Sequence, residues 1–206
     1  MAKKPADSYQ HGDLREALVD AGVKLLLEGG VEQLSLRAAA QLAGVSHAAP
    51  YRHYRDKDAL LGAIAERGFR LLTKSMRTEL EQSRARAAHK QLIAIGVGYV
   101  TFGATHPAYL QLIFGGVLNK NAASEELRAA GTQAYAVLRD VVARGIQSGE
   151  FRKADVDESA LVCWSLVHGL SMLIINGAVP RPASAALERA LVERMLGLLG
   201  AGMNTS

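Results

Sequence analysis

The chain has 206 residues, of which 49% are hydrophobic, and this composition supports a sizeable buried core and excludes a disordered polymer. Its formal net charge of +4 permits a nucleic-acid partner without requiring one. The single cysteine, Cys163, excludes an internal disulfide and any zinc site built from several thiolates.

Helix-forming residues dominate nearly every window, and the alternation typical of strands is hard to find, so an all-α fold of about nine helices is expected. The polar residues 1–10 are expected to form an arm. They lack the apolar centre of a signal peptide, and no uninterrupted apolar run reaches the roughly 18 residues that span a bilayer. A cytoplasmic protein without a membrane partner is therefore expected.

The first helix is predicted over residues 11–28, where leucine recurs at helical spacing, and the Gly29-Gly30 pair supplies its stop. Ser35 is a suitable N-cap for a second helix that continues to about residue 43. Gly44 then ends that helix, because it can adopt the positive φ of a tight turn.

A third short helix is predicted over residues 46–54, directly after the turn. Asp56 can cap a long fourth helix that runs toward Glu81. Proline and glycine residues mark the breaks between the helices that follow this fourth helix. The later helices are predicted at residues 88–105, 107–115, 122–147, 155–178 and 184–199.

The segment SLRAAAQLAGVSHAAPYRHYRDKDALL, residues 35–61, has the plan of a helix-turn-helix, whose second helix can enter the major groove of DNA. Its Ser-capped helix and its Gly-Val-Ser turn resemble the motif of the TetR family of transcriptional regulators. The start HGDLREALVDAG, residues 11–22, also resembles the first helix of that family. Further positions at the family's spacing are Tyr51, Tyr54, Lys57 and Leu60.

The resemblance implies that this segment binds double-stranded operator DNA. Arg37 can contact guanine or phosphate, with a surface ion pair as the plainer alternative. By resemblance Tyr51 and Lys57 clamp phosphates and Tyr54 plugs the core, whereas Pro50 departs from the family's common leucine. The predicted DNA-binding residues are Arg37, Ser46, His47, Ala48, Ala49, Tyr51, Arg52, His53 and Lys57.

Two C-terminal stretches, residues 105–116 and 164–177, resemble a TetR subgroup with a Trp-x-x-x-His-Gly signature, here Trp164, His168 and Gly169. A packed core face with one hydrogen-bonded histidine is the alternative to a ligand pocket. No metal or cofactor is expected. The predicted effector-binding residues are Phe102, His106, Tyr109, Phe114, Trp164, His168 and Met172.

The last helix carries an apolar stripe that can pair with a second copy of the chain, and the family resemblance implies a homodimer. The expected division is a DNA-binding domain at residues 1–60 and an effector-binding and dimerisation domain at 61–206. A repressor released by a small, mainly apolar effector is expected, with a ligand-independent architectural DNA binder or a helical enzyme as alternatives. No catalytic motif supports the enzyme. The stripe consists of Leu187, Leu191, Met195 and Leu198.

Overall fold

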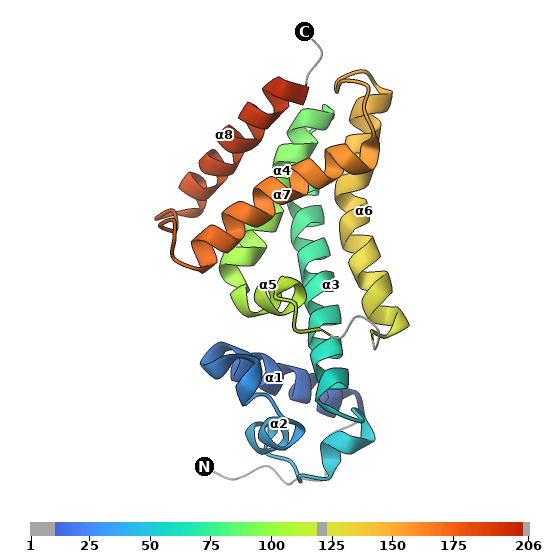
Figure 1. The fold of residues 1–206 in the computed structure, drawn as a ribbon, viewed down its shortest axis with the longest axis vertical. Helices are drawn as coiled ribbons and strands as arrows, with labels where there is room; N and C mark the ends of the chain where they lie inside the picture. Colours follow the sequence, from blue (N-terminus) through green and yellow to red (C-terminus); the bar gives the residue numbers. More distant parts are fainter. Residues whose placement is uncertain (1–10, 119–122, 204–206) are drawn as a thin grey trace. The chain divides into compact units, whose positions relative to one another are not determined.

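A computed structural model of the chain describes residues 11–118 and 123–203, so the predicted arm at residues 1–10 lies outside the described residues. Within this part of the chain the regular elements are eight α-helices and one short 3₁₀ helix (Figure 1). The predicted all-α fold is confirmed.

The helix α1 (His11–Gln33) begins at the predicted residue but continues past its predicted end, whereas α2 (Leu36–Ala43) lies between its predicted caps Ser35 and Gly44. Gly29 and Gly30 have non-helical dihedral angles inside α1, and Gly30 has a φ of 67°. The predicted stop is therefore a kink, beyond which one more turn continues to the end of α1.

The third predicted helix, residues 46–54, is wrong in type and length, because only the 3₁₀ helix η1 (Ala49–Arg52) forms there. Pro50 has no N–H to donate to the carbonyl of Ser46, four residues earlier. The amide of Ala49 takes that carbonyl instead, at 3.0 Å, which is the tighter spacing of a 3₁₀ helix. A proline near the helix start thus prevents a regular α-helical turn.

The long helix α3 (Lys57–Ser83) follows at the predicted place, and the amide of Ala59 donates to Oδ1 of Asp56 at 2.8 Å. Asp155 likewise caps α7 by accepting from the amides of Asp157 and Glu158. The later helices lie where they were predicted, with ends shifted by a few residues. They are α4 (Ala88–Thr105), α5 (Pro107–Phe114), α6 (Glu125–Gln147), α7 (Val156–Ile175) and α8 (Ala185–Met203).

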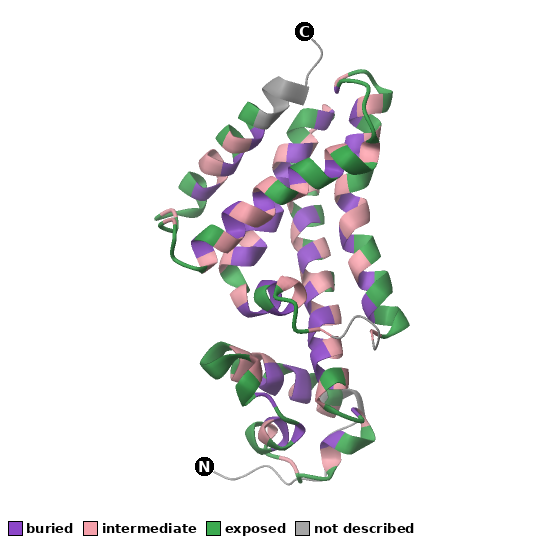
Figure 2. Cartoon of the chain, in the orientation of Figure 1, coloured by how far each residue is buried: buried purple, intermediate pink, exposed green. Residues whose placement is uncertain are grey.

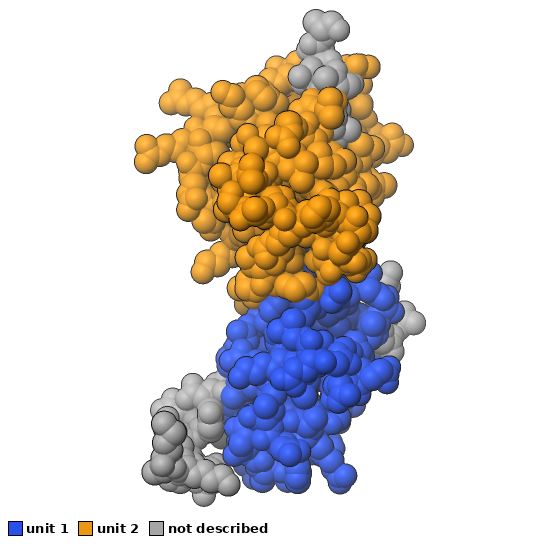
Figure 3. Space-filling view, turned by 90° about the vertical axis from the view of Figure 1, so that its left-hand side faces the viewer, with its two compact units in different colours: residues 1–68, 108–128 blue, residues 69–107, 129–206 orange. Residues whose placement is uncertain are grey.

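The chain forms two compact units (Figure 3). Unit 1 comprises residues 1–68 and 108–128, and unit 2 comprises residues 69–107 and 129–206. The compact units therefore differ from the expected functional division at residue 60, which falls inside α3. Unit 1 contains α5 in addition to the helix-turn-helix segment.

Each unit has its own buried core (Figure 2). In unit 1, α1 packs against α2, and Leu18, Leu60 and Ile64 are fully buried. In unit 2, α4 packs against both α7 and α8. Close packing in unit 2 uses small residues, because a Cβ on Gly96 would lie 2.4 Å from a methyl carbon of Leu196.

Among the described residues, α7 is long and apolar enough to cross a membrane by length and composition. The search for uninterrupted apolar runs did not find this helix, because polar residues such as Ser165 and His168 interrupt the run while the mean hydropathy of the helix stays high. One such helix is weak evidence for a membrane span, since core helices of soluble proteins have the same composition.

Candidate nucleic-acid interface and effector site

The turn between α2 and η1 is fixed by local hydrogen bonds. Oγ of Ser35 accepts from the amide of Ala38 at 3.0 Å and satisfies one of the free donors at the start of α2. Gly44 has a φ of 73°, and its N–H and that of Val45 donate back to carbonyls of α2. This turn sets the direction in which the chain enters η1.

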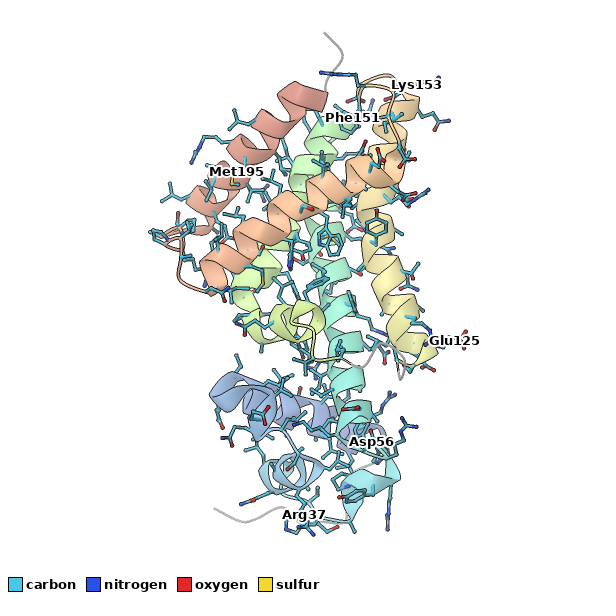
Figure 4. The ribbon with its side chains drawn as sticks, viewed as in Figure 1. Arg37, Asp56, Glu125, Phe151, Lys153 and Met195 are labelled. Atoms are coloured by element: carbon cyan, nitrogen blue, oxygen red, sulfur yellow. The ribbon has the colours of Figure 1, made fainter. Side chains whose placement is uncertain are left out.

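The side chains predicted to bind DNA lie mostly on the surface of unit 1. Arg37, whose position Figure 4 marks, is exposed on α2. Tyr51 on η1 exposes 57% of its surface. The exposed members of the set are Arg37, Ser46, His47, Ala48, Tyr51 and Arg52, and the half-buried members are Ala49, His53 and Lys57.

Lys57 has a structural contact that the sequence did not predict. Its Nζ donates to the carbonyl of Val31 at 2.6 Å and ties the start of α3 to the end of α1. An ammonium group has three donors, so this bond leaves capacity for a phosphate oxygen. The role of Lys57 as a phosphate clamp stays a prediction.

Tyr54 lies in the core of unit 1, as the family resemblance implied, with 3% of its surface exposed. Its hydroxyl donates to the carbonyl of Arg15 at 3.4 Å. Burial raises the pKa of Tyr54, so the hydroxyl stays protonated and remains a donor. This hydrogen bond connects Tyr54, two residues after η1, to the N-terminal part of α1.

In unit 2, a chain of hydrogen bonds joins α7 to α4. Nε1 of Trp164 donates to the hydroxyl oxygen of Tyr99 at 3.2 Å, and that oxygen lies 2.9 Å from Nδ1 of His168. An indole N–H can only donate, so the hydroxyl oxygen of Tyr99 accepts from Trp164. The tautomer of His168 sets which group donates in its hydrogen bond with the Tyr99 hydroxyl.

The pKa values of this cluster agree with neutral groups. Burial raises the pKa of the Tyr99 phenol and lowers the pKa of His168 below its ordinary 6.5. Nearby, burial raises the pKa of the Cys163 thiol to about 11, which makes that cysteine unreactive. Among the described residues no group of His, Cys, Asp or Glu side chains is arranged to hold a metal ion.

The structure does not gather all seven predicted effector residues in one unit. The ring of Phe102 on α4 and that of His106, the C-cap of α4, have centroids 5.4 Å apart, and Met172 is half-buried on α7. Tyr109 and Phe114 belong to unit 1 instead. There Tyr109 packs against Gly68 of α3.

Sequence reasoning missed Tyr99 and Tyr135. Tyr99 connects Trp164 and His168, and the ring of Tyr135 packs edge-on against Trp164 at 6.3 Å. Tyr99 lies three residues before Phe102 on α4, a spacing that places both on one helix face. This spacing could have identified Tyr99 from the sequence. No pattern in the sequence indicates that Tyr135 on α6 contacts Trp164 on α7.

Comparison with known proteins identifies the family. Residues 92–199 match the model described as "Tetracyclin repressor-like, C-terminal domain", and residues 18–64 match "Bacterial regulatory proteins, tetR family". The chain belongs to the TetR family. The helix-turn-helix of this TetR-family protein lies within the second match. The matches do not name a subgroup, so the Trp-His-Gly assignment stays a prediction.

The HTH-type transcriptional regulator Rv1816 of Mycobacterium tuberculosis is 27% identical over 139 residues, which are 67% of this chain and 59% of the relative. The chain thus matches less than two thirds of that relative's length. A solved Rhodococcus sp. RHA1 protein of unknown function is 30% identical with a TM-score of 0.82, covering 97% of this chain and 100% of that one.

More distant solved structures share the fold of the TetR-family protein. FadR of Bacillus subtilis in complex with stearoyl-CoA is 18% identical with a TM-score of 0.69, covering 92% of this chain and 99% of that one. The TetR-family regulator PfmR of Thermus thermophilus is 22% identical with a TM-score of 0.65, covering 87% of this chain and 97% of that one.

Proposed function

We propose that this TetR-family protein is a transcriptional repressor that binds a palindromic operator as a homodimer and is released from it by a small, mainly apolar effector. The observation that carries the proposal is the capped helix-turn-helix of unit 1, within which Arg37, His47 and Tyr51 are all exposed. Arginine, histidine and tyrosine supply the base and phosphate contacts that such motifs make. TetR-family regulators are typically transcription factors and not enzymes.

The effector part of the proposal rests on unit 2. The cluster of Tyr99, Trp164 and His168 supplies a few directed polar groups among mainly apolar buried side chains of unit 2, and small-molecule sites commonly have this composition. The complex of Bacillus subtilis FadR with stearoyl-CoA supports an effector with a long apolar part. We propose a small, mainly apolar effector for this protein, with Phe102, Trp164 and Met172 as apolar contacts.

The homodimer is supported by apolar side chains that the single chain leaves exposed on its last two helices. Leu173 on α7 exposes 48% of its surface and Leu198 on α8 exposes 79%. Such patches commonly mark protein interfaces. Two other members of the predicted stripe, Leu191 and Met195, are half-buried. Further exposed members of the patch are Leu161, Val162 and Leu187.

Sedimentation tests the homodimer directly. Leu198→Asp would bury a charge in the interface and should give monomers at micromolar protein concentration. Leu27→Asp is the matched control, because Leu27 is 61% exposed on α1 and outside the proposed interface. A wild-type monomer that still binds a palindrome tightly would contradict the proposed assembly.

Sequence selection from fragmented genomic DNA tests operator binding, and the selected fragments serve for titration. His47→Ala should change the preferred base sequence. Lys57→Ala should weaken binding to all sequences alike and reduce the magnitude of the slope of log K against log salt concentration by about 0.9. Selection of no common sequence would refute the proposed function. We also propose a cytoplasmic location, where operator DNA is accessible.

A further inference from the structure

An ion-pair cluster in unit 1 joins α3 to α1. Nη1 of Arg67 on α3 lies 2.5 Å from Oδ1 of Asp20 and 3.6 Å from Oε2 of Glu16, both on α1. We propose that Arg67 is a positioning residue for operator binding, which holds α1 and the recognition segment attached to it at the angle that DNA requires. The inference rests on the proposed function and adds a residue that lies outside the helix-turn-helix.

Arg67 differs from an ordinary surface ion pair because its guanidinium lies near two carboxylates. Glu16 and Asp20 are four residues apart, so both carboxylates lie on one face of α1 and meet the same guanidinium. The Arg67 side chain is 36% exposed. Burial lowers the pKa of Arg67, but the hydrogen bond to Asp20 and the nearby Tyr109 and Glu16 outweigh it and raise the pKa.

The next residue, Gly68, lies where α3 packs against α5. A Cβ built on Gly68 would lie 2.8 Å from Cδ1 of Tyr109 and 2.9 Å from Cδ1 of Ile113, so α5 approaches the α3 backbone closely. Arg67 and Gly68 therefore form a junction in which α3 is packed against α5 and hydrogen-bonded to α1. A shift of α1 along α3 would break the pair with Asp20.

The same helix α1 is tied to the recognition segment. Tyr54, which follows η1, donates to the carbonyl of Arg15, the neighbour of Glu16. Lys57 donates to Val31 at the far end of α1. These two hydrogen bonds connect α1 to the residues on the C-terminal side of η1, so a displacement of α1 would be passed to the recognition segment. Arg67 acts on DNA through this helix and needs no contact with phosphate.

Isolated ion pairs near the surface contribute little to fold stability, so variants of this cluster should remain folded. Arg67→Met and Asp20→Asn are each expected to weaken binding of the wild-type-selected operator about fivefold to tenfold, the lower part of the usual range for coupled sites. The double variant Arg67→Asp/Asp20→Arg restores an opposite-charge pair and should recover at least half of the lost binding free energy.

Arg139→Met is the matched control. It breaks a similarly exposed pair in unit 2, where Nε of Arg139 lies 2.8 Å from Oδ1 of Asp157. Its operator affinity should equal that of the wild type. An equal loss in Arg139→Met and Arg67→Met would overturn the inference, because general charge reduction would then explain both.

The salt dependence of binding separates positioning from direct contact. Loss of a phosphate contact reduces the magnitude of the negative slope of log K against log salt concentration by about 0.9, whereas loss of a positioning residue leaves this slope unchanged. Weaker binding with an unchanged slope and recovery in the double variant is the expected result. Wild-type affinity in Arg67→Met and Asp20→Asn, or a lowered slope, would overturn it. Should Arg67→Met melt below the assay temperature, Asp20→Asn decides alone.

These outcomes are distinct from a failure of the proposed function. The operator is selected first with the wild-type protein, and only a sequence-specific complex enters the comparison. If the wild type selects no sequence, the proposed function fails before any Arg67 variant is measured. If it does, the affinity and slope of the variants test only the role of Arg67.

Discussion

The hydroxyl of Tyr99 lies 2.9 Å from Nδ1 of His168 and accepts from Nε1 of Trp164 on its other side. Trp164 and His168 are one helical turn apart on α7, and Tyr99 belongs to α4. A single oxygen atom therefore joins the two helices.

Tyr99→Phe should destabilise the protein by about 1–3 kcal/mol, because it removes the partner of two half-buried polar groups. Equilibrium urea unfolding measures the change in the free energy of unfolding. Tyr135→Phe is the control, since Tyr135 contacts Trp164 through its ring and keeps that contact without its hydroxyl. Equal stability of the two variants would contradict a structural role for the Tyr99 hydroxyl.

His168 should make stability depend on pH. Burial lowers the pKa of His168 in the folded protein below the ordinary value of 6.5, so the unfolded chain binds its proton first as the pH falls. The contribution is fully present above pH 6.5 and is lost as the pH falls from 6.5 through the folded-state pKa. Unfolding of wild type and His168→Gln at several pH values measures this. His168→Gln should show a smaller loss of stability over that window, and an unchanged pH dependence would refute the assignment.

Pro50→Leu should convert part of η1 into an α-helix, because it restores an amide that can donate to the carbonyl of Ser46. The helical signal in circular dichroism should rise, and the base sequence selected from random DNA should change as His47 rotates. Pro50→Ala restores the same amide with a smaller side chain. Unchanged helicity and DNA preference in both variants would show that the proline does not determine the 3₁₀ conformation.

Gly98→Ala should destabilise unit 2 by about 1–3 kcal/mol through overpacking. A Cβ at this position would lie 2.7 Å from Cα of Met76 and 2.8 Å from the carbonyl oxygen of Ser75, and backbone atoms cannot easily move aside. Gly62→Ala is the control in an open part of α3, where the nearest atom is 3.9 Å away. It should stabilise the helix by about 0.5–1 kcal/mol. Thermal unfolding of both variants should therefore give shifts of opposite sign.

Local sequence signals were sufficient to predict several helix ends. Ser35, Asp56 and Asp155 each cap the helix that follows through a side-chain oxygen only a few residues away from its donor. Gly44 ends α2 because its own φ is positive. The helix-turn-helix could be predicted for the same reason. The prediction of an α-helix over residues 46–54 was wrong. Pro50 has no N–H to donate to the carbonyl of Ser46, and the surrounding helix-turn-helix sequence did not compensate for this loss.

Contacts between side chains far apart in the sequence depend on the tertiary structure and could not be predicted from local patterns. The partners Tyr99 and Trp164 are 65 residues apart, and Lys57 and Val31 are 26 apart, so no periodicity within one helix connects them. Tyr109 looks like a neighbour of Phe102 in sequence, yet Pro107 begins a new helix and the two residues belong to different compact units. Helical patterns specify a buried face, whereas its contacts depend on how whole helices pack, because packing is a property of two surfaces and not of one segment.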